Sequence, residues 1–193
     1  MRKKSRRVFS GRVMVALVAA LTLSVLGTGI ASSSAQPAKR AADATVFIRA
    51  GKNHSLKFVA PDTIRTGQSL RVINKTSARV VGPHTFSLVA RSALPKTKPA
   101  RQSCFARGHI CRSIAGWHGV RGNTVTKNPA EAGKEGWDTQ GTTSKKGDSW
   151  FTGGKPNNSF TQDVSVGVPG SPKRLFFMCA IHPFMQGSVK VLP

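Results

Sequence analysis

The chain has 193 residues, enough for one domain or at most two, and a formal net charge of +23 at pH 7. Beyond its N-terminal region, no segment is long and apolar enough to span a bilayer. So large a basic excess favours acidic partners. Nucleic acid is the usual partner of such a chain, but the sequence contains no nucleic-acid-binding motif.

The first 35 residues have the order of parts of a secretory signal peptide. Met1 to Arg12 carries six Lys/Arg and no acid, and Val13 to Leu26 is almost wholly apolar. Small residues then precede Gln36 and offer a cleavage site. The apolar run is short for a spanning helix, although an uncleaved anchor is the alternative. We therefore expect a signal peptide over 1–35, a linker over 36–41 and no membrane span after cleavage.

The signal peptide predicts export to the periplasm, the cell envelope or the extracellular space. Ser5-Arg6-Arg7-Val8-Phe9 fits the twin-arginine pattern, and a general secretory signal is the alternative. Cleavage leaves 24 Lys/Arg against 7 Asp/Glu, a net charge of +17. Export argues against a nucleic-acid partner. We expect a monomer that meets an acidic partner, either a redox protein or an anionic envelope polymer; a basic surface without a dedicated partner is the alternative.

Residues 42–193 contain short strand patterns separated by turn signals, which predict an all-β fold of the β-sandwich type. The predicted strands are 45–48, 56–58, 70–74, 85–89, 160–166, 174–178 and 187–192.

Strand patterning fades between residues 91 and 155, where Gly, Ser, Thr, Lys and Asn dominate. We interpret this segment as a long irregular insertion with partial order, because it holds three tryptophans and two cysteines. In an oxidising compartment, pairing of Cys104 with Cys111 leaves Cys179 as a free thiol. His109 and His118 also lie here and could form an accessory metal site, although no carboxylate accompanies them.

The stretch from Cys179 to Met185 contains the side chains best suited to bind a metal ion. It places a thiol, the His182 imidazole and a thioether within seven residues, with two residues between neighbours. Strand patterns lie on both sides, so a tight loop would hold the three donors together. These soft-to-borderline donors favour copper, and a blue-copper site needs a second histidine. Gly82-Pro83-His84, at the mouth of another predicted strand, offers one.

Cys-x-x-His-Pro-Phe-Met-x-Gly at 179–187 resembles the ligand loop of the cupredoxins, within the plastocyanin/amicyanin group. Gly-Pro-His before a strand is similar to the site of that family's first histidine. The resemblance covers roughly 42–90 and 156–193. It implies a Greek-key β-sandwich with one type 1 copper ion, bound by His84, Cys179, His182 and Met185. The chain departs from the family at Thr85, at Met178 and in the segment 91–155.

The resemblance implies one-electron transfer with a redox partner protein. A copper storage, delivery or protection protein is the alternative function, and a cupredoxin-like interaction module without copper is a third. A buried structural cysteine and a His2Cys zinc site remain alternatives for the loop itself. We expect no enzymatic activity, since the chain shows no paired carboxylates, Ser/His/Asp set or phosphate loop.

Overall fold

The computed structural model describes residues 44–52, 55–131, 136–153, 158–164 and 173–193, which all belong to one unit, 37–193. The predicted signal peptide (1–35), the predicted linker (36–41) and the end of the predicted strand 160–166 lie outside the described residues. No helix in the described ranges is long and apolar enough to cross a membrane.

Nine described strands form two sheets, which confirms the predicted all-β sandwich. The first sheet has the order β2-β1-β4-β7, and the second has the order β3-β9-β8-β5-β6. Both sheets are mixed, because β1 pairs with β4, and β3 with β9, in parallel, while the other pairs are antiparallel. The strands are β1 (Ala44–Ala50), β2 (Leu56–Val59), β3 (Thr63–Arg65), β4 (Ser69–Asn74), β5 (Thr85–Leu88), β6 (Ser149–Phe151), β7 (Ser159–Asp163), β8 (Arg174–Met178) and β9 (Gln186–Leu192).

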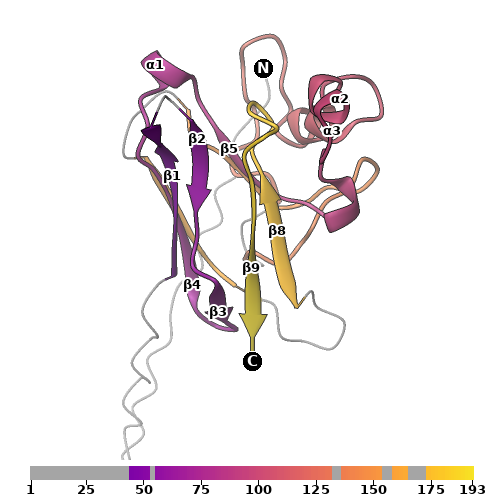
Figure 1. Ribbon diagram of the computed structural model, residues 1–193. Coiled ribbons are helices and arrows are strands. Elements are labelled where there is room, and N and C mark those ends of the chain that lie inside the picture. Colours follow the sequence, from indigo (N-terminus) through magenta and orange to yellow (C-terminus); the bar gives the residue numbers. More distant parts are fainter. Residues whose placement is uncertain (1–43, 53–54, 132–135, 154–157, 165–172) are drawn as a thin grey trace, which may run out of the picture. The chain divides into compact units, whose positions relative to one another are not determined.

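The main hydrophobic core lies between the sheets. Figure 1 shows β1, β2 and β4 in one layer and β8 and β9 in the other. Side chains alternate along each strand, so one face of each sheet supplies the apolar residues that meet in this core. The core includes Val46, Ile48, Leu70, Val72, Phe86, Leu88, Leu175, Phe177, Val189 and Val191.

The insertion is more ordered than its composition suggests. It contains a 3-10 turn η2 (Arg91–Ala93), two helices, α2 (Lys98–Gln102) and α3 (Ile110–Trp117), and the edge strand β6. A disulfide joins Cys104 to Cys111, as predicted. α2 and α3 lie outside the second layer (Figure 1).

A second hydrophobic cluster attaches the insertion to the second sheet. The apolar side chains of α3 pack against residues of β8 and the segments that follow β5 and β8. The cluster consists of Val89, Cys104, Ile110, Cys111, Ile114, Trp117, Ala130, Met178 and Ala180. Consequently all four residues of β5 are buried, although Ser87 alternates with Phe86 and Leu88 in a pattern typical of a half-exposed strand.

Two tryptophans of the insertion also make close packing contacts with distant parts of the chain. Trp137 is fully buried in the main core, and its indole N–H donates to the Leu70 carbonyl at 3.1 Å. Trp117 lies so close to Gly141 that a Cβ there would come within 2.1 Å of the indole ring, so only glycine fits at this position.

Candidate metal centre

His84 is placed by a short apolar helix and a turn. The helix α1 (Ala78–Val81) ends at Gly82, whose φ of 77° favours glycine. Pro83 follows, and His84 directly precedes β5, where its side chain is fully buried. The prediction that a histidine opens this strand is therefore confirmed.

Cys179 follows the last residue of β8 and begins a closed loop. The backbone N–H of Cys179 donates to the Met185 carbonyl at 3.0 Å, and the N–H of Met185 donates to the His182 carbonyl at 2.8 Å. β9 begins immediately after Met185. Because antiparallel pairing of β8 with β9 fixes both ends of the loop, its side chains are held in place by the sheet.

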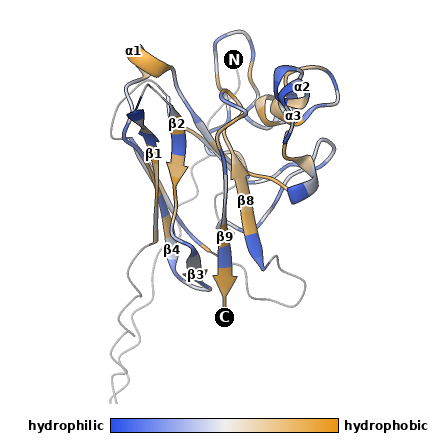
Figure 2. Ribbon diagram, in the orientation of Figure 1, coloured by the Kyte–Doolittle hydropathy of each residue, from blue (hydrophilic) through white to orange (hydrophobic). Residues whose placement is uncertain are grey.

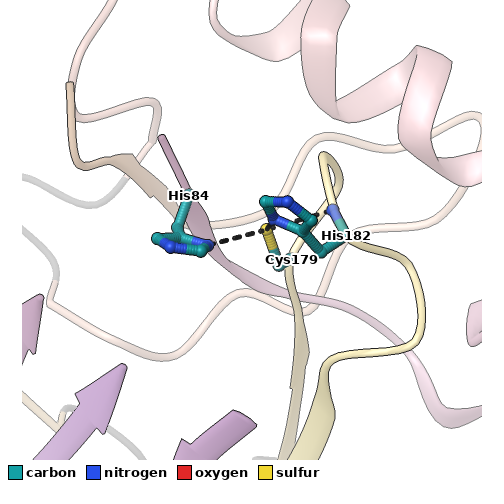
Figure 3. A group of neighbouring side chains, drawn as sticks. All are labelled: His84, Cys179 and His182. Carbon is teal, nitrogen blue, oxygen red and sulfur yellow. Dashed lines mark hydrogen bonds between the residues drawn. The ribbon is translucent and has the colours of Figure 1, made fainter. Parts of the chain in front are cut away.

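His84, Cys179 and His182 meet at one point, with their donor atoms all within 4.8 Å of one another. Figure 3 shows the two imidazoles on either side of the cysteine sulfur. The Sγ–Nδ1 distances are 3.9 Å to His84 and 3.7 Å to His182. Metal bonds of about 2.0 Å to nitrogen and about 2.3 Å to sulfur, 120° apart, place the two donors about 3.7 Å from each other. The three groups therefore fit a single shared ion.

The hydrogen bonds of His84 fix which of its nitrogens faces the sulfur. Thr76 Oγ1 donates to Asn74 Oδ1 at 2.7 Å, so its single proton is already used. Thr76 Oγ1 must then accept from His84 Nε2, 2.8 Å away. The proton is therefore on Nε2, and the Nδ1 lone pair is directed toward Cys179. A hydrogen bond from the far nitrogen is the usual way in which proteins orient a metal-binding histidine.

Burial keeps both histidines neutral. Burial, with a smaller contribution from the positive charge that His182 can carry, lowers the pKa of His84 from 6.5 to about 4. Burial also lowers the pKa of His182, while a hydrogen bond to the Val81 backbone opposes this shift. The ring centroids are 4.9 Å apart. Two neutral imidazoles this close are ready to bind a metal ion without first losing protons.

The cysteine sulfur is surrounded by donors. It accepts the backbone N–H of Thr85 at 3.3 Å and that of His182 at 3.4 Å. Burial raises the pKa of the Cys179 thiol, and these N–H groups only partly offset the shift. The thiol is therefore protonated at neutral pH, and a bound cation would be needed to hold it as a thiolate.

The fourth predicted ligand, Met185, is buried in the main core at the end of the loop. Its backbone bonds tie it to Cys179 and His182. The role of its thioether sulfur as a ligand stays a prediction.

The accessory metal site that His109 and His118 could form is not assembled. Both ring nitrogens of His118 are engaged, with the Lys127 carbonyl at 2.8 Å and with Ser149 Oγ at 2.7 Å. His109 is exposed, at the start of α3. Within the described ranges, the metal-binding group consists of His84, Cys179 and His182.

Three supporting residues were not found from the sequence. Thr76 orients His84, Val81 contacts His182, and Thr85 donates its N–H to the sulfur. In the sequence, Thr85 is distinguished only as a departure from the family pattern. Thr76 acts through its hydroxyl and Val81 through its backbone carbonyl. Neither residue belongs to a recognisable motif, so no local signal in the sequence identifies them.

No family profile matches the chain, and no curated protein is significantly similar to it.

Proposed function

We propose that this chain is an exported type 1 copper protein of the cupredoxin family that transfers single electrons. The observation that carries the proposal is the convergence of His84 Nδ1, His182 Nδ1 and Cys179 Sγ at distances suited to one ion. Two imidazoles and a thiolate, with Met185 as a weak axial donor, are the blue-copper ligand set. Copper held by these donors would accept and release one electron.

The donor set favours copper over zinc. A structural zinc site is closed by four strong ligands, most often cysteine and histidine. Among the described residues, no fourth His, Cys, Asp or Glu joins the group. The next residue of the loop that can donate is Met185, and a thioether selects soft ions such as Cu(I).

The protein supplies a preformed and largely buried site. His84 and Cys179 are completely buried, and their orientations are set by Thr76 and Thr85. Because the surrounding strands already fix these side chains, loss or gain of an electron would require little movement of the donors. This rigidity supports an electron carrier rather than a protein that hands its ion to another, which must open its site.

Exposed apolar side chains lie on the loop and on the helix that contact His182. The Phe184 ring, 51% exposed, lies 5.9 Å from the His182 ring between centroids. The backbone of Val81, the last residue of α1, hydrogen-bonds to His182; Val80 in the same helix is 68% exposed, and the whole helix is apolar except for Arg79 (Figure 2). A redox partner that docks here would approach within a short distance of a metal ligand. Basic residues elsewhere on the chain would favour a partner with an acidic surface.

Repeated reduction and oxidation of the copper-loaded protein tests the proposal. An electron carrier should cycle at one potential and retain its copper throughout. His182→Ala removes a ligand at the exposed edge, so both the spectrum and the electron exchange should be badly damaged. Release of copper to an acceptor in the reduced state, without a stable reversible potential, would instead support copper delivery or storage.

A further inference from the structure

A chain of buried hydroxyl groups connects the insertion to the cysteine sulfur. His118 Nε2 lies 2.7 Å from Ser149 Oγ, and Ser149 Oγ lies 2.7 Å from Ser87 Oγ. The Ser87 hydroxyl donates to Thr85 Oγ1 at 3.0 Å. Thr85 lies against the sulfur, to which its backbone N–H donates at 3.3 Å, and its side-chain hydroxyl lowers the pKa of the Cys179 thiol. The imidazole and the three hydroxyl residues are each at most 5% exposed. The path from His118 to the sulfur is therefore continuous and shielded from solvent.

Each hydroxyl has one proton, so the donors along the chain determine one another. Thr85 Oγ1 accepts from Ser87 and from the Ala180 N–H at 2.8 Å, which leaves its own proton for Cys179. Because the Ser87 proton is given to Thr85, Ser149 must donate to Ser87. Ser149 Oγ can then only accept from His118 Nε2.

The opposite nitrogen of His118 also needs a proton. His118 Nδ1 lies 2.8 Å from the Lys127 carbonyl, which can only accept. This order of donors therefore requires protons on both nitrogens of His118, because Nε2 donates to Ser149 and Nδ1 donates to the Lys127 carbonyl. In the neutral imidazole, Nδ1 keeps its proton for the carbonyl, and Nε2 must accept from Ser149. Ser149 then accepts from Ser87, so Ser87 no longer donates to Thr85. The Thr85 hydroxyl then donates to Ser87 Oγ and not to the sulfur.

We propose that His118 is a positioning residue for the metal centre: its protonation state sets the direction of the Ser149–Ser87–Thr85 chain and thereby decides whether the Thr85 hydroxyl donates to Cys179 Sγ. This inference rests on the proposed function, because it assigns His118 a role in tuning the metal-bound sulfur. A hydrogen bond to the thiolate stabilises the reduced centre, in which more negative charge stays on sulfur. The reduction potential should accordingly rise when His118 gains a proton, and reduction should raise the proton affinity of His118 by the same factor.

Three basic side chains and one carboxyl lie on the elements around His118, and burial raises the pKa of the carboxyl, Asp148, to about 7. Arg112 in α3 and Arg121 and Lys127 in the following loop have exposed side chains. Asp148, next to Ser149, is buried, and its Oδ2 accepts the backbone N–H groups of Asp138 and Thr139. Burial lowers the pKa of His118 from its usual 6.5, opposed by the hydrogen bond to the Lys127 carbonyl. The switch therefore operates on the acid side of pH 6.5.

The metal-free protein provides the first test, by nitrogen-15 NMR of the His118 ring during a pH titration. Ser87→Ala breaks the chain but leaves His118 and Ser149 in place. Ser149 is then free to donate to the neutral imidazole, so the pKa of His118 should be lower in Ser87→Ala than in the wild type. An unchanged His118 pKa in this variant would overturn the proposal, because it would show that the hydroxyl chain does not sense the imidazole.

The copper-loaded protein provides the second test. Between pH 4 and 8, the thiolate-to-copper band of the wild type should move to higher energy, and the reduction potential should rise, as His118 is protonated. Ser87→Ala and His118→Gln should both lose this component of the pH profile, whereas the exposed His109→Gln should retain it. A charge acting through space would survive in Ser87→Ala, so a wild-type profile in that variant would refute the relay. Absence of the copper colour in the wild type would refute the metal centre itself and this inference with it, while coloured variants with unaltered profiles would refute the inference alone.

Discussion

His84 illustrates how a single side chain can be prepared for metal binding by the fold. Its ring is completely buried, its far nitrogen is bonded to Thr76, and its near nitrogen faces the cysteine sulfur. The same burial makes protonation costly, so the metal-free site should be sensitive to acid.

The metal-free protein should lose stability as the pH falls from about 6.5 to about 4. In this range the unfolded chain binds a proton at His84, whereas the folded chain does not, because burial lowers the pKa to about 4. The unfolded state therefore gains protons, and the free energy of unfolding decreases toward acid pH; the lowered pKa of His182 acts in the same direction. Urea denaturation at several pH values measures this slope. His84→Gln should flatten it, and an identical slope in that variant would contradict the assignment.

Met185→Gln tests the fourth ligand. A thioether at long axial distance contributes little binding energy but stabilises Cu(I) relative to a harder oxygen donor. The variant should still bind copper and stay coloured, while its reduction potential falls, as voltammetry would show. If the potential were unchanged, Met185 would serve only as a core residue, and the centre would have three ligands.

At the scale of the structural elements, the insertion is a layer that covers the second sheet. Its disulfide closes a short loop at the start of α3, and Ile114 of that helix is fully buried in the second hydrophobic cluster. The insertion also covers the outer face of β5, which carries Ser87. Damage to this layer should affect stability more than copper binding.

Replacing both Cys104 and Cys111 by serine should lower the free energy of unfolding by about 2–3 kcal/mol, the value that the chain-entropy relation gives for so short a loop. The copper spectrum should persist, because Cys179 is the free thiol of the described chain. Denaturant unfolding of the copper-loaded protein, followed by the charge-transfer colour, measures both effects. Ile114→Ala, which should cost about 2–5 kcal/mol, serves as a second variant in the same layer. Loss of colour in a folded double variant would show that the insertion supports the ligands directly.

The strands and the three clustered residues could be predicted because their signals are local. Alternation of polar and apolar residues marks β2, β5 and β9, a continuous apolar run marks β8, and the spacing of Cys179 and His182 follows from a single loop. The link to His84 was predicted from its position before a strand. Pairing of sheets then brings this residue within reach of the cysteine, 95 residues away in the sequence.

The insertion could not be predicted in the same detail because its order depends on distant contacts. α3 is only eight residues long, too short to be stable alone, and it forms against Met178 and Ala180 from the other end of the chain. β6 has three residues and exists by pairing with β5. The polar composition of the segment concealed the few buried side chains that hold it in place.

For the molecule as a whole, the basic charge should attract acidic partners, while the two sheets hold the candidate metal site in place. If the signal peptide is removed after residue 35, the remaining chain carries 24 Lys/Arg against 7 Asp/Glu. Export and cleavage stay predictions, as does the acidic partner. The exposed Phe184, beside His182, and the exposed Val80 in α1 offer apolar contacts on an otherwise basic protein.

Electron exchange should therefore be faster with acidic than with basic redox proteins of similar potential, and salt should slow it. Long-range attraction raises the association rate, and ions screen it over about 10 Å at 0.1 M ionic strength. Stopped-flow kinetics over a range of salt concentrations would measure the effect. Phe184→Ser should lower the rate at every salt concentration without changing the salt slope. Rates independent of salt and of partner charge would contradict an electrostatic encounter.

The most direct test of the metal centre is the optical and electron-spin resonance spectrum of the purified protein after addition of Cu(II). We predict one copper per chain and an intense thiolate-to-copper charge-transfer band. Cys179→Ser should abolish the band, because an alcohol is a poor soft donor at neutral pH. A wild-type protein that binds no copper, or a band that persists in Cys179→Ser, would contradict the assignment of this site.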